Sequence, residues 1–135
     1  MHYLLDTNVC IVYLNGRSLS VRDRLLATAT EDMAVCSVVK AELFYGAFRS
    51  NHPQRTLERQ QAFLSQFVSL PFHDEAALLS GRIRAELAKA GMPIGSYDLQ
   101  IAAIALANDL TLVTHNTREF ERVEGLQIED WEVPD

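Results

Sequence analysis

Three acidic residues occupy positions at which an α/β protein could use them for metal-dependent chemistry. Asp6 directly follows the apolar run YLL, Glu42 lies in SVVKAELFYGAF, and Asp98 opens the apolar stretch LQIAAIALA. Clustered carboxylates repel one another, so a site that gathers several of them calls for a cation. Oxygen ligands without paired His or Cys favour Mg²⁺ or Mn²⁺ over zinc, and the four histidines here are scattered. Such ions activate water and stabilise the attacking and leaving oxygens of a phosphodiester, so no side-chain nucleophile is needed.

Asn116 and Glu119 extend this set of candidates toward the C-terminus. Asn116 follows the run TLVT, which places its amide at the end of another predicted strand, and Glu119 comes three residues later. The pair could contribute to a metal site, with Glu119 acting through a water molecule. The same spacing equally fits a capping box at the start of a short helix.

The three acids also have purely structural interpretations. Asp6 or Thr7 could cap the following helix, and Glu42 could lie at the surface or pair with an arginine. Asp98 could be a first-turn acid behind a Ser96 cap, where the helix dipole favours negative charge. Their joint placement favours the metal site, because all three fall near strand-to-helix junctions on one predicted edge of a sheet.

The elements that must position these residues alternate along the chain. Strands are predicted from short apolar runs at 2–5, Met33–Cys36, 68–72 and 111–114, with a candidate fifth at 126–128. Helices are predicted at Thr7–Leu14, 21–29, 37–48 with Ser37 as cap, from Pro53 onward, 74–91, 97–108 and 117–122. This alternation predicts an α/β fold with a parallel sheet covered on both faces. In such sheets ligands bind beyond the carboxyl ends of the strands.

Composition is compatible with one globular domain over residues 1–135. Hydrophobic residues make up 48% and charged residues 22%, an ordinary globular mixture. The net charge of −6 is unexpected for a nucleic-acid-binding surface, but residues 119–135 alone carry seven acids and one base. Residues 1–118 are therefore balanced in charge, so the acidity does not exclude an RNA substrate.

A cytoplasmic location is expected. No apolar run approaches the roughly 20 residues of a membrane span, and the N-terminus lacks the basic start of a secretory signal. Cys10 and Cys36 sit in apolar surroundings without a CxxC or His spacing. We expect both to be small buried hydrophobic residues in a reducing compartment.

Four fragments of the sequence resemble a known family. LLDTN, AELFYGA around residue 44, IGSYDLQIAAIAL and LVTHNTREFERVEGL occur in the order and spacing of PIN-domain VapC toxins. The resemblance runs from residue 3 to about residue 131. It implies a PIN-like three-layer α/β/α fold with four to five short parallel strands and Mg²⁺- or Mn²⁺-dependent endoribonuclease activity. It also implies a homodimer and a higher assembly with an inhibitory VapB-type antitoxin.

The resemblance also assigns roles to particular residues. The three acids of the family fall on Asp6, Glu42 and Asp98, and its fourth position, often Asp, falls on Asn116. A neutral amide there would hold a second metal less firmly than a carboxylate. Thr7 and Thr114 would hold Asp6 or a metal-bound water. The family's known substrates are RNAs of the translation machinery, both tRNAs and a loop of ribosomal RNA (rRNA). Of these we expect tRNA, with initiator tRNA among the candidates, cut in a single-stranded loop.

The sequence also predicts two contact surfaces, one for RNA and one for the antitoxin. Basic residues that could contact RNA lie between positions 40 and 59: Lys40, Arg49, His52, Arg55 and Arg59. Solvated helix faces explain the same residues equally well. The carboxylate cluster would attract a cationic side chain of the antitoxin, an arginine above all, and the acidic tail could add to that attraction.

Two other functions remain open from the sequence. A Mg²⁺-dependent phosphatase also begins with a strand followed by Asp, but it needs a second acid two residues later, where this chain has Asn8. A PIN-like binding or regulatory module that has lost catalysis is the other alternative. The presence of all three acids argues against it.

Overall fold

The sheet places the ends of three strands beside one another. The structure is a computed structural model that describes residues 1–133, so Pro134 and the last tail acid, Asp135, lie outside the described residues. Five parallel strands are ordered β3-β2-β1-β4-β5: β1 Tyr3–Leu5, β2 Met33–Cys36, β3 Val68–Leu70, β4 Thr111–Val113 and β5 Ile128–Glu129. With β1 in the centre, the carboxyl ends of β1, β2 and β4 are neighbours.

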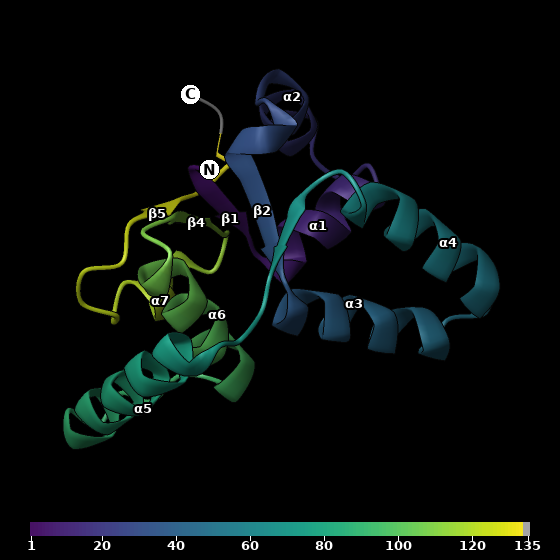
Figure 1. Cartoon of the computed structure of the whole chain (residues 1–135). Coiled ribbons are helices and arrows are strands. Elements are labelled where there is room, and N and C mark those ends of the chain that lie inside the picture. The colour runs from purple at the N-terminus through teal and green to yellow at the C-terminus, as the bar shows by residue number, and fades with distance from the viewer. Residues whose placement is uncertain (134–135) are drawn as a thin grey trace.

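Helices cover both faces of this sheet (Figure 1). The first group is α1 Thr7–Leu14, α2 Leu19–Ala27, α3 Ser37–Arg49 and α4 Pro53–Leu64, and the second is α5 Asp74–Lys89, α6 Ser96–Ala107 and the short α7 Thr117–Phe120. The chain moves from β1 toward β3 through the first group and returns across the sheet through the second. Right-handed crossovers therefore put the two groups on opposite faces, which gives the three layers predicted from the sequence.

The order in which the chain adds strands to the sheet reverses between the neighbouring strands β1 and β4. Connections leave these two strands toward opposite sides of the sheet, which creates the crevice where α/β proteins bind ligands. Asp6 follows β1 and Thr114 follows β4, so both residues lie at this crevice.

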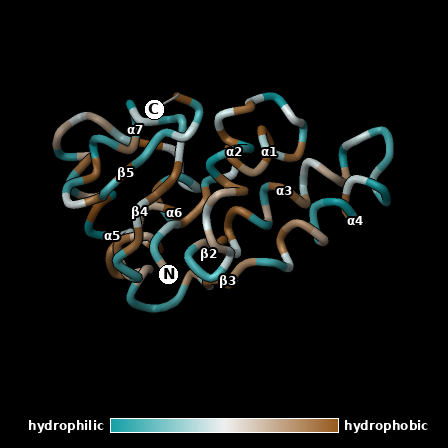
Figure 2. Tube along the Cα trace, turned by 90° about the horizontal axis from the view of Figure 1, so that it is seen from above, coloured by the Kyte–Doolittle hydropathy of each residue, from teal (hydrophilic) through white to brown (hydrophobic). Residues whose placement is uncertain are grey.

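The core explains why these short strands form. Leu4, Leu5 and Leu112 are fully buried, and so are all four residues of β2. In α6 the run from Ile101 to Ala105 is completely buried, as its all-round apolar sequence predicts. Figure 2 shows apolar segments (brown) near β4 and α6, whereas β5 and outer parts such as α4 carry hydrophilic stretches (teal).

Some predicted boundaries and caps were wrong. The fifth strand is shifted toward the C-terminus of the predicted 126–128, and β3 is two residues shorter than predicted. Ser37 is the first residue of α3, and Cys36 holds the cap position without a side-chain bond. Ser18 caps α2, which therefore begins at Leu19 and not at residue 21. The predicted stop of α5 is confirmed, since Gly91 has φ of 70° directly after the C-cap residue Ala90.

Both cysteines are buried and free, as predicted. Burial raises the pKa of both thiols, that of Cys36 to about 11, so neither is a reactive thiolate near neutral pH. Within residues 1–133, none of the helices combines the length and apolar character that a membrane crossing needs.

Candidate active site

Asp6 is fixed at the end of β1 by hydrogen bonds to both carboxylate oxygens. It is the N-cap of α1, and its Oδ1 accepts the backbone N–H of Thr7 at 2.8 Å. Its Oδ2 accepts the hydroxyl of Thr114 at 2.8 Å. The residue is only 3% exposed, and this burial raises its pKa despite those two bonds; the charge of Glu42 adds to the effect. The helix-cap interpretation is thus correct, but it does not account for the second oxygen or for the burial.

Thr7 connects Asp6 to Glu42. Its hydroxyl donates to Oε1 of Glu42 at 2.7 Å, while its backbone N–H is already bound to Asp6. Glu42 lies in the second turn of α3 and is partly buried, so it is not a fully solvated surface acid. The partner shown for this carboxylate is a hydroxyl and not an arginine.

Asp98 faces the same acids from α6. It lies in the first turn, whereas the cap position belongs to Gly95 and carries no side-chain bond, so the expected Ser96 cap is absent. Burial raises the pKa of Asp98 to about 7, and a hydrogen bond with Glu119 and the charges of Asp6, Glu119 and Glu42 act in the same direction. Asp98 is therefore close enough to these carboxylates to be destabilised by them in its charged form.

Asn116 and Glu119 join the site through Thr114. The hydroxyl of Thr114 accepts the backbone N–H of Asn116 at 3.0 Å while donating to Asp6. The side-chain amide of Asn116 donates to Oε2 of Glu119 at 2.6 Å. Asn116 is at the cap position of α7 but makes no side-chain cap bond, so the capping-box interpretation is wrong. A hydrogen-bonded chain instead runs from Asp6 through Thr114 and Asn116 to Glu119, which contacts Asp98.

Two hollows in the surface reach the carboxylate of Glu42. One hollow of about 370 Å³ between α1, α3 and α4 includes Glu42 in its lining, together with Arg59 and the buried Gln60. A second of about 460 Å³ is lined by Thr7, Glu42 and two tyrosines. Glu42 borders both hollows, so a molecule bound in either one would lie beside this carboxylate.

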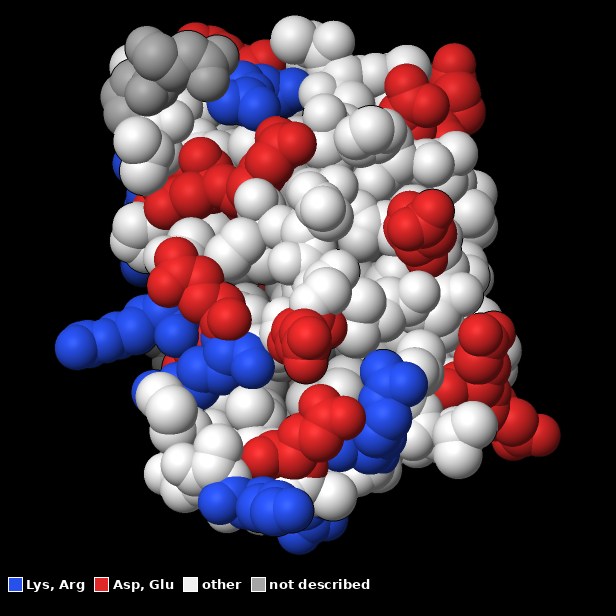
Figure 3. Space-filling model, turned by 90° about the vertical axis from the view of Figure 1, so that its left-hand side faces the viewer, with Lys and Arg blue, Asp and Glu red and all other residues white. Residues whose placement is uncertain are grey.

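The predicted basic residues lie on the α3–α4 pair. Lys40 and Arg49 belong to α3, and Arg55 and Arg59 belong to α4. Arg49 stacks over the ring of Tyr45, and Arg59 donates to the last carbonyl of α1 at 2.6 Å. Arg59 also lines the hollow that Glu42 borders. A role of these four residues in RNA contact stays a prediction. Figure 3 shows a different face, on which acidic side chains (red) are spread among uncharged ones (white) without forming one block.

Sequence reasoning missed Tyr45 and Tyr97. Both line the second hollow beside Glu42, and they are 63% and 59% exposed. Large aromatic side chains exposed at a hollow are suited to stacking against unpaired bases. A signal was available, because each tyrosine lies within three residues of a candidate acid. Asn8 was considered only as the missing second acid of a phosphatase, and it lines the same hollow.

Comparison with known proteins agrees with this architecture. The sequence pattern of the PIN domain matches residues 3–126. The tRNA(fMet)-specific endonuclease VapC of Shigella flexneri is 44% identical over 131 residues, which cover 97% of this chain and 98% of that protein. The protein of the same description from Salmonella typhimurium is 41% identical with the same coverage.

Solved structures give the same result. DNA-bound VapBC from Salmonella typhimurium contains a chain with a TM-score of 0.91 and 40% identity, which covers 97% of this chain and 98% of that one. A chain of VapBC2 from Rickettsia felis, bound to a promoter DNA fragment, has a TM-score of 0.90 and 36% identity. The match covers 97% of this chain and 99% of that one. The chain therefore belongs to the PIN-domain family, and within that family to the VapC ribonucleases.

Proposed function

We propose that this chain is the toxin of a toxin–antitoxin pair and cuts tRNA, initiator tRNA first, with Mg²⁺ or Mn²⁺ held by Asp6, Glu42 and Asp98. The observation that carries the proposal is the convergence of these carboxylates from β1, α3 and α6 at the crevice of the sheet. Burial raises the pKa of Asp98 to about 7, and a hydrogen bond with Glu119 and repulsion by the charges of Asp6, Glu119 and Glu42 add to this rise. A divalent cation would relieve that repulsion, and an all-oxygen donor set is what Mg²⁺ prefers.

The spacing of the acids also fits such an ion. Asp6 and Glu42 are held by the two donors of Thr7, and within residues 1–133 no three of the acids at this site bring their ligand atoms within 4.8 Å of one another. Mg²⁺ retains several waters and is usually bound through one or two carboxylates plus substrate phosphate, so a wide arrangement suits it. When bound, the metal would activate a water and stabilise charge on the scissile phosphate.

The chain's own residues have distinct parts in this proposal. Thr7 and Thr114 fix the carboxylate of Asp6, so that its position does not depend on solvent. Glu119, tethered by Asn116 beside Asp98, offers a fourth carboxylate that would support a bound metal from beside Asp98. Asn116 itself contributes a neutral amide oxygen, a weaker ligand than the Asp often found at this family position.

The RNA substrate is inferred from the relatives and from the hollows. Proteins that are 44% and 41% identical over nearly their full length are specific for tRNA(fMet). Tyr45 and Tyr97 beside Glu42 supply stacking surfaces for bases of a single-stranded loop. Small phosphate esters would make no use of these two rings, so the hollow supports the nuclease over the phosphatase.

The proposed partners follow from the solved relatives. VapBC-5 from Mycobacterium tuberculosis, 27% identical with a TM-score of 0.69, belongs to the VapBC family of toxin-antitoxin systems. We propose a VapB-type antitoxin for this chain as well, with an arginine inserted among the carboxylates. We also propose that the whole chain is one PIN domain that forms a homodimer and works in the reducing cytoplasm, where the buried free thiols persist.

Sequencing of RNA ends tests the proposal. The purified protein, free of antitoxin, is incubated with total cellular RNA and Mg²⁺ or Mn²⁺, alongside the Asp98→Asn variant and an EDTA control. Discrete new ends in initiator tRNA, absent with the variant and with EDTA, are the expected result. Folded protein that yields no new ends with either ion would favour the catalytically silent binding module.

A further inference from the structure

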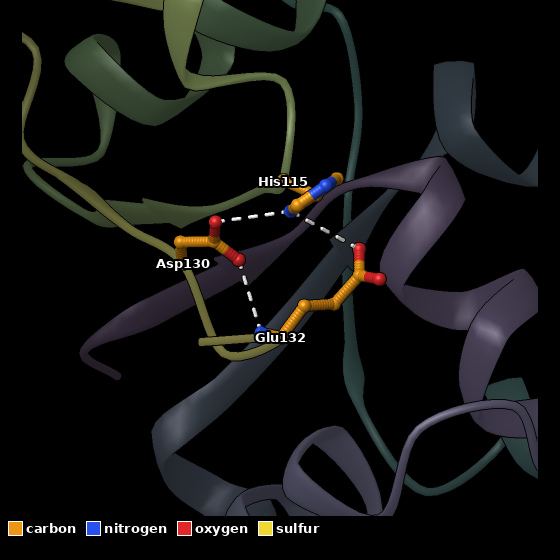
Figure 4. A group of neighbouring side chains, drawn as sticks. All are labelled: His115, Asp130 and Glu132. Carbon is orange, nitrogen blue, oxygen red and sulfur yellow. Dashed lines mark hydrogen bonds and ion pairs between the residues drawn. The ribbon is translucent and has the colours of Figure 1, made fainter. Parts of the chain in front are cut away.

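A second group of metal-ligating side chains lies outside the acidic cluster. Within residues 1–133, His115, Asp130 and Glu132 are the residues that bring three His, Cys, Asp or Glu donor atoms within 4.8 Å of one another. Figure 4 shows the His115 ring between the two carboxylates, with its Nδ1 turned toward both. The acids of the candidate active site are spaced more widely.

We propose that His115, Asp130 and Glu132 bind a transition-metal cation, with Zn²⁺ as the best fit, at a site separate from the Mg²⁺ or Mn²⁺ centre. Nδ1 of His115 lies 3.0 Å from Oδ2 of Asp130 and 3.5 Å from Oε2 of Glu132. Zinc bonds to nitrogen and oxygen of about 2.0–2.2 Å in tetrahedral geometry require ligand atoms roughly 3.3–3.6 Å apart. Nδ1 of His115 therefore stands close to the required separation from both carboxylate oxygens, and all three donor atoms lie within 4.8 Å of one another.

The backbone holds the two carboxylates on one side of the tail. Trp131 between them is almost completely buried, its ring packs against Tyr3, and its carbonyl accepts the hydroxyl of Ser20 at 2.8 Å. Trp131 and Glu132 lie in a turn just after β5, and Figure 4 shows the carboxylates of Asp130 and Glu132 both turned toward His115. The backbone N–H of Glu132 donates to Oδ1 of Asp130 at 3.0 Å, which leaves Oδ2 facing His115.

The histidine is positioned by the neighbouring strand. His115 directly follows Thr114, whose backbone N–H donates to the carbonyl of Glu129 at 2.9 Å, next to Asp130. The ends of β4 and β5 thus bring the two parts of the site together. Preorganised ligands lose little conformational freedom when a metal binds, which strengthens binding.

The chemistry of the donors selects the metal. An imidazole nitrogen with two carboxylates suits Zn²⁺ and its neighbours in the first transition row, whereas Mg²⁺ prefers oxygen alone. His115 and Glu132 line an open hollow of about 450 Å³ together with Asn8, Arg17 and Asn116, so ions and water reach the site. Water from this hollow would complete the coordination. The bound metal would clamp the tail to the loop that carries Asn116.

The site makes a specific prediction for zinc binding. Metal-free full-length protein is titrated with ZnCl₂ by calorimetry near neutral pH, and its unfolding temperature is measured with and without Zn²⁺. His115→Asn and Glu132→Gln remove a ligand, and Asp98→Asn disables the other centre as a matched control. Loss of a hydrogen bond that supports a metal ligand lowers metal affinity by roughly 10- to 100-fold. Because His115→Asn and Glu132→Gln each remove a ligand itself, we expect their Zn²⁺ affinity to fall by more than that.

The outcomes separate a metal site from a simple ion pair. The proposal expects Asp98→Asn to retain the tight Zn²⁺ event and the rise in unfolding temperature, and both ligand variants to lose them. Unfolding in EDTA identifies any variant that fails to fold, in which case the other ligand variant decides. If His115→Asn and Glu132→Gln bind Zn²⁺ as the unmodified chain does, or if Asp98→Asn alone abolishes binding, the group is only an ion pair and the proposal is wrong.

Discussion

The hydroxyl of Thr114 donates to Oδ2 of Asp6 at 2.8 Å, although the two residues are separated by 108 positions in the sequence. The same hydroxyl accepts the backbone N–H of Asn116 at 3.0 Å. Thr114 is fully buried, so each of these bonds replaces a bond to water that is unavailable there. One side chain therefore sets the position of a candidate metal ligand and of the loop that carries Asn116 and Glu119.

Replacing Thr114 by Val tests this relationship. Valine has nearly the same shape but leaves Oδ2 of Asp6 and the N–H of Asn116 unsatisfied, so we expect a loss of about 1–3 kcal/mol in the free energy of unfolding. Mg²⁺ affinity in a cleavage titration should fall on the order of 10- to 100-fold. Thr114→Ser retains the hydroxyl and should retain most of the affinity. Equal Mg²⁺ affinity in the Val and Ser variants would show that Thr114 does not position Asp6.

Asp98 should destabilise the metal-free protein as the pH rises. Its pKa of about 7 in the folded state lies above the ordinary value of 3.8, so folding favours its protonated form. The cost of the charged form is absent below about pH 4, grows between about pH 4 and 7, and is complete above pH 7. Asp98→Asn removes this cost, and the new amide can still donate to Glu119.

Denaturation in EDTA checks this prediction. Because Asp98 is partly exposed, we expect Asp98→Asn to be more stable by only about 1–2 kcal/mol near pH 8, with the difference disappearing near pH 4. Mg²⁺ should reduce the difference at high pH by stabilising the unmodified chain. A variant that is less stable than the unmodified chain at pH 8 in EDTA would contradict the proposed repulsion.

Asn116→Asp should make the fold more dependent on metal. The amide of Asn116 donates to Glu119 at 2.6 Å, and a carboxylate in its place would repel Glu119. We expect the unfolding temperature in EDTA to drop by about 3–6 °C, which corresponds to roughly 1 kcal/mol. The rise on adding Mg²⁺ should exceed that of the unmodified chain. Asn116→Ser, which adds no charge, is the control, and an identical Mg²⁺ response in all three proteins would argue against a role of this position in metal binding.

Tyr97 should contribute to RNA binding through its ring. It lies beside Glu42 in the same hollow and is largely exposed, so its removal should not disturb the core. We expect Tyr97→Ala to weaken tRNA binding by about 1–3 kcal/mol, the usual contribution of one stacked base, and Tyr97→Phe to bind normally. Filter binding in Ca²⁺ with the inactive Asp98→Asn background separates binding from cleavage. Unchanged affinity of the Ala variant would remove this ring from the RNA-contact surface.

Most of the architecture was predictable from the sequence because its signals are local. The buried runs at Tyr3–Leu5 and Met33–Cys36 and the uniformly apolar α6 have few alternatives once their lengths are considered. The position of Asp6 at the carboxyl end of β1 then follows from the parallel sheet, whereas the strand order β3-β2-β1-β4-β5 comes from the structure. Boundaries were less predictable: the limits of β5 depend on tertiary hydrogen bonds such as that from the N–H of Thr114 to the carbonyl of Glu129.

The candidate site was predictable only in part, for a physical reason. Strand ends pointed to Asp6 and Asn116, but the contact between Asn116 and Glu119 looked like a capping box, since both arrangements use the same spacing. The pairing of His115 with Asp130 and Glu132 depends on the lateral contact of β4 and β5. His115 and Asp130 are 15 positions apart with α7 between them, so no local pattern indicates this pairing.

Cleavage of initiator tRNA by the Glu42→Gln variant tests the central claim most directly. Glutamine retains an oxygen that accepts the Thr7 hydroxyl now bound at 2.7 Å, so the substitution removes the charge while preserving that contact. With Mn²⁺ or Mg²⁺, we expect the unmodified chain to cut initiator tRNA at one loop position, and Glu42→Gln to be slower by at least about 100-fold while remaining folded. Equal cleavage by the two proteins, or cleavage that persists in EDTA, would contradict metal-dependent catalysis at this acidic cluster.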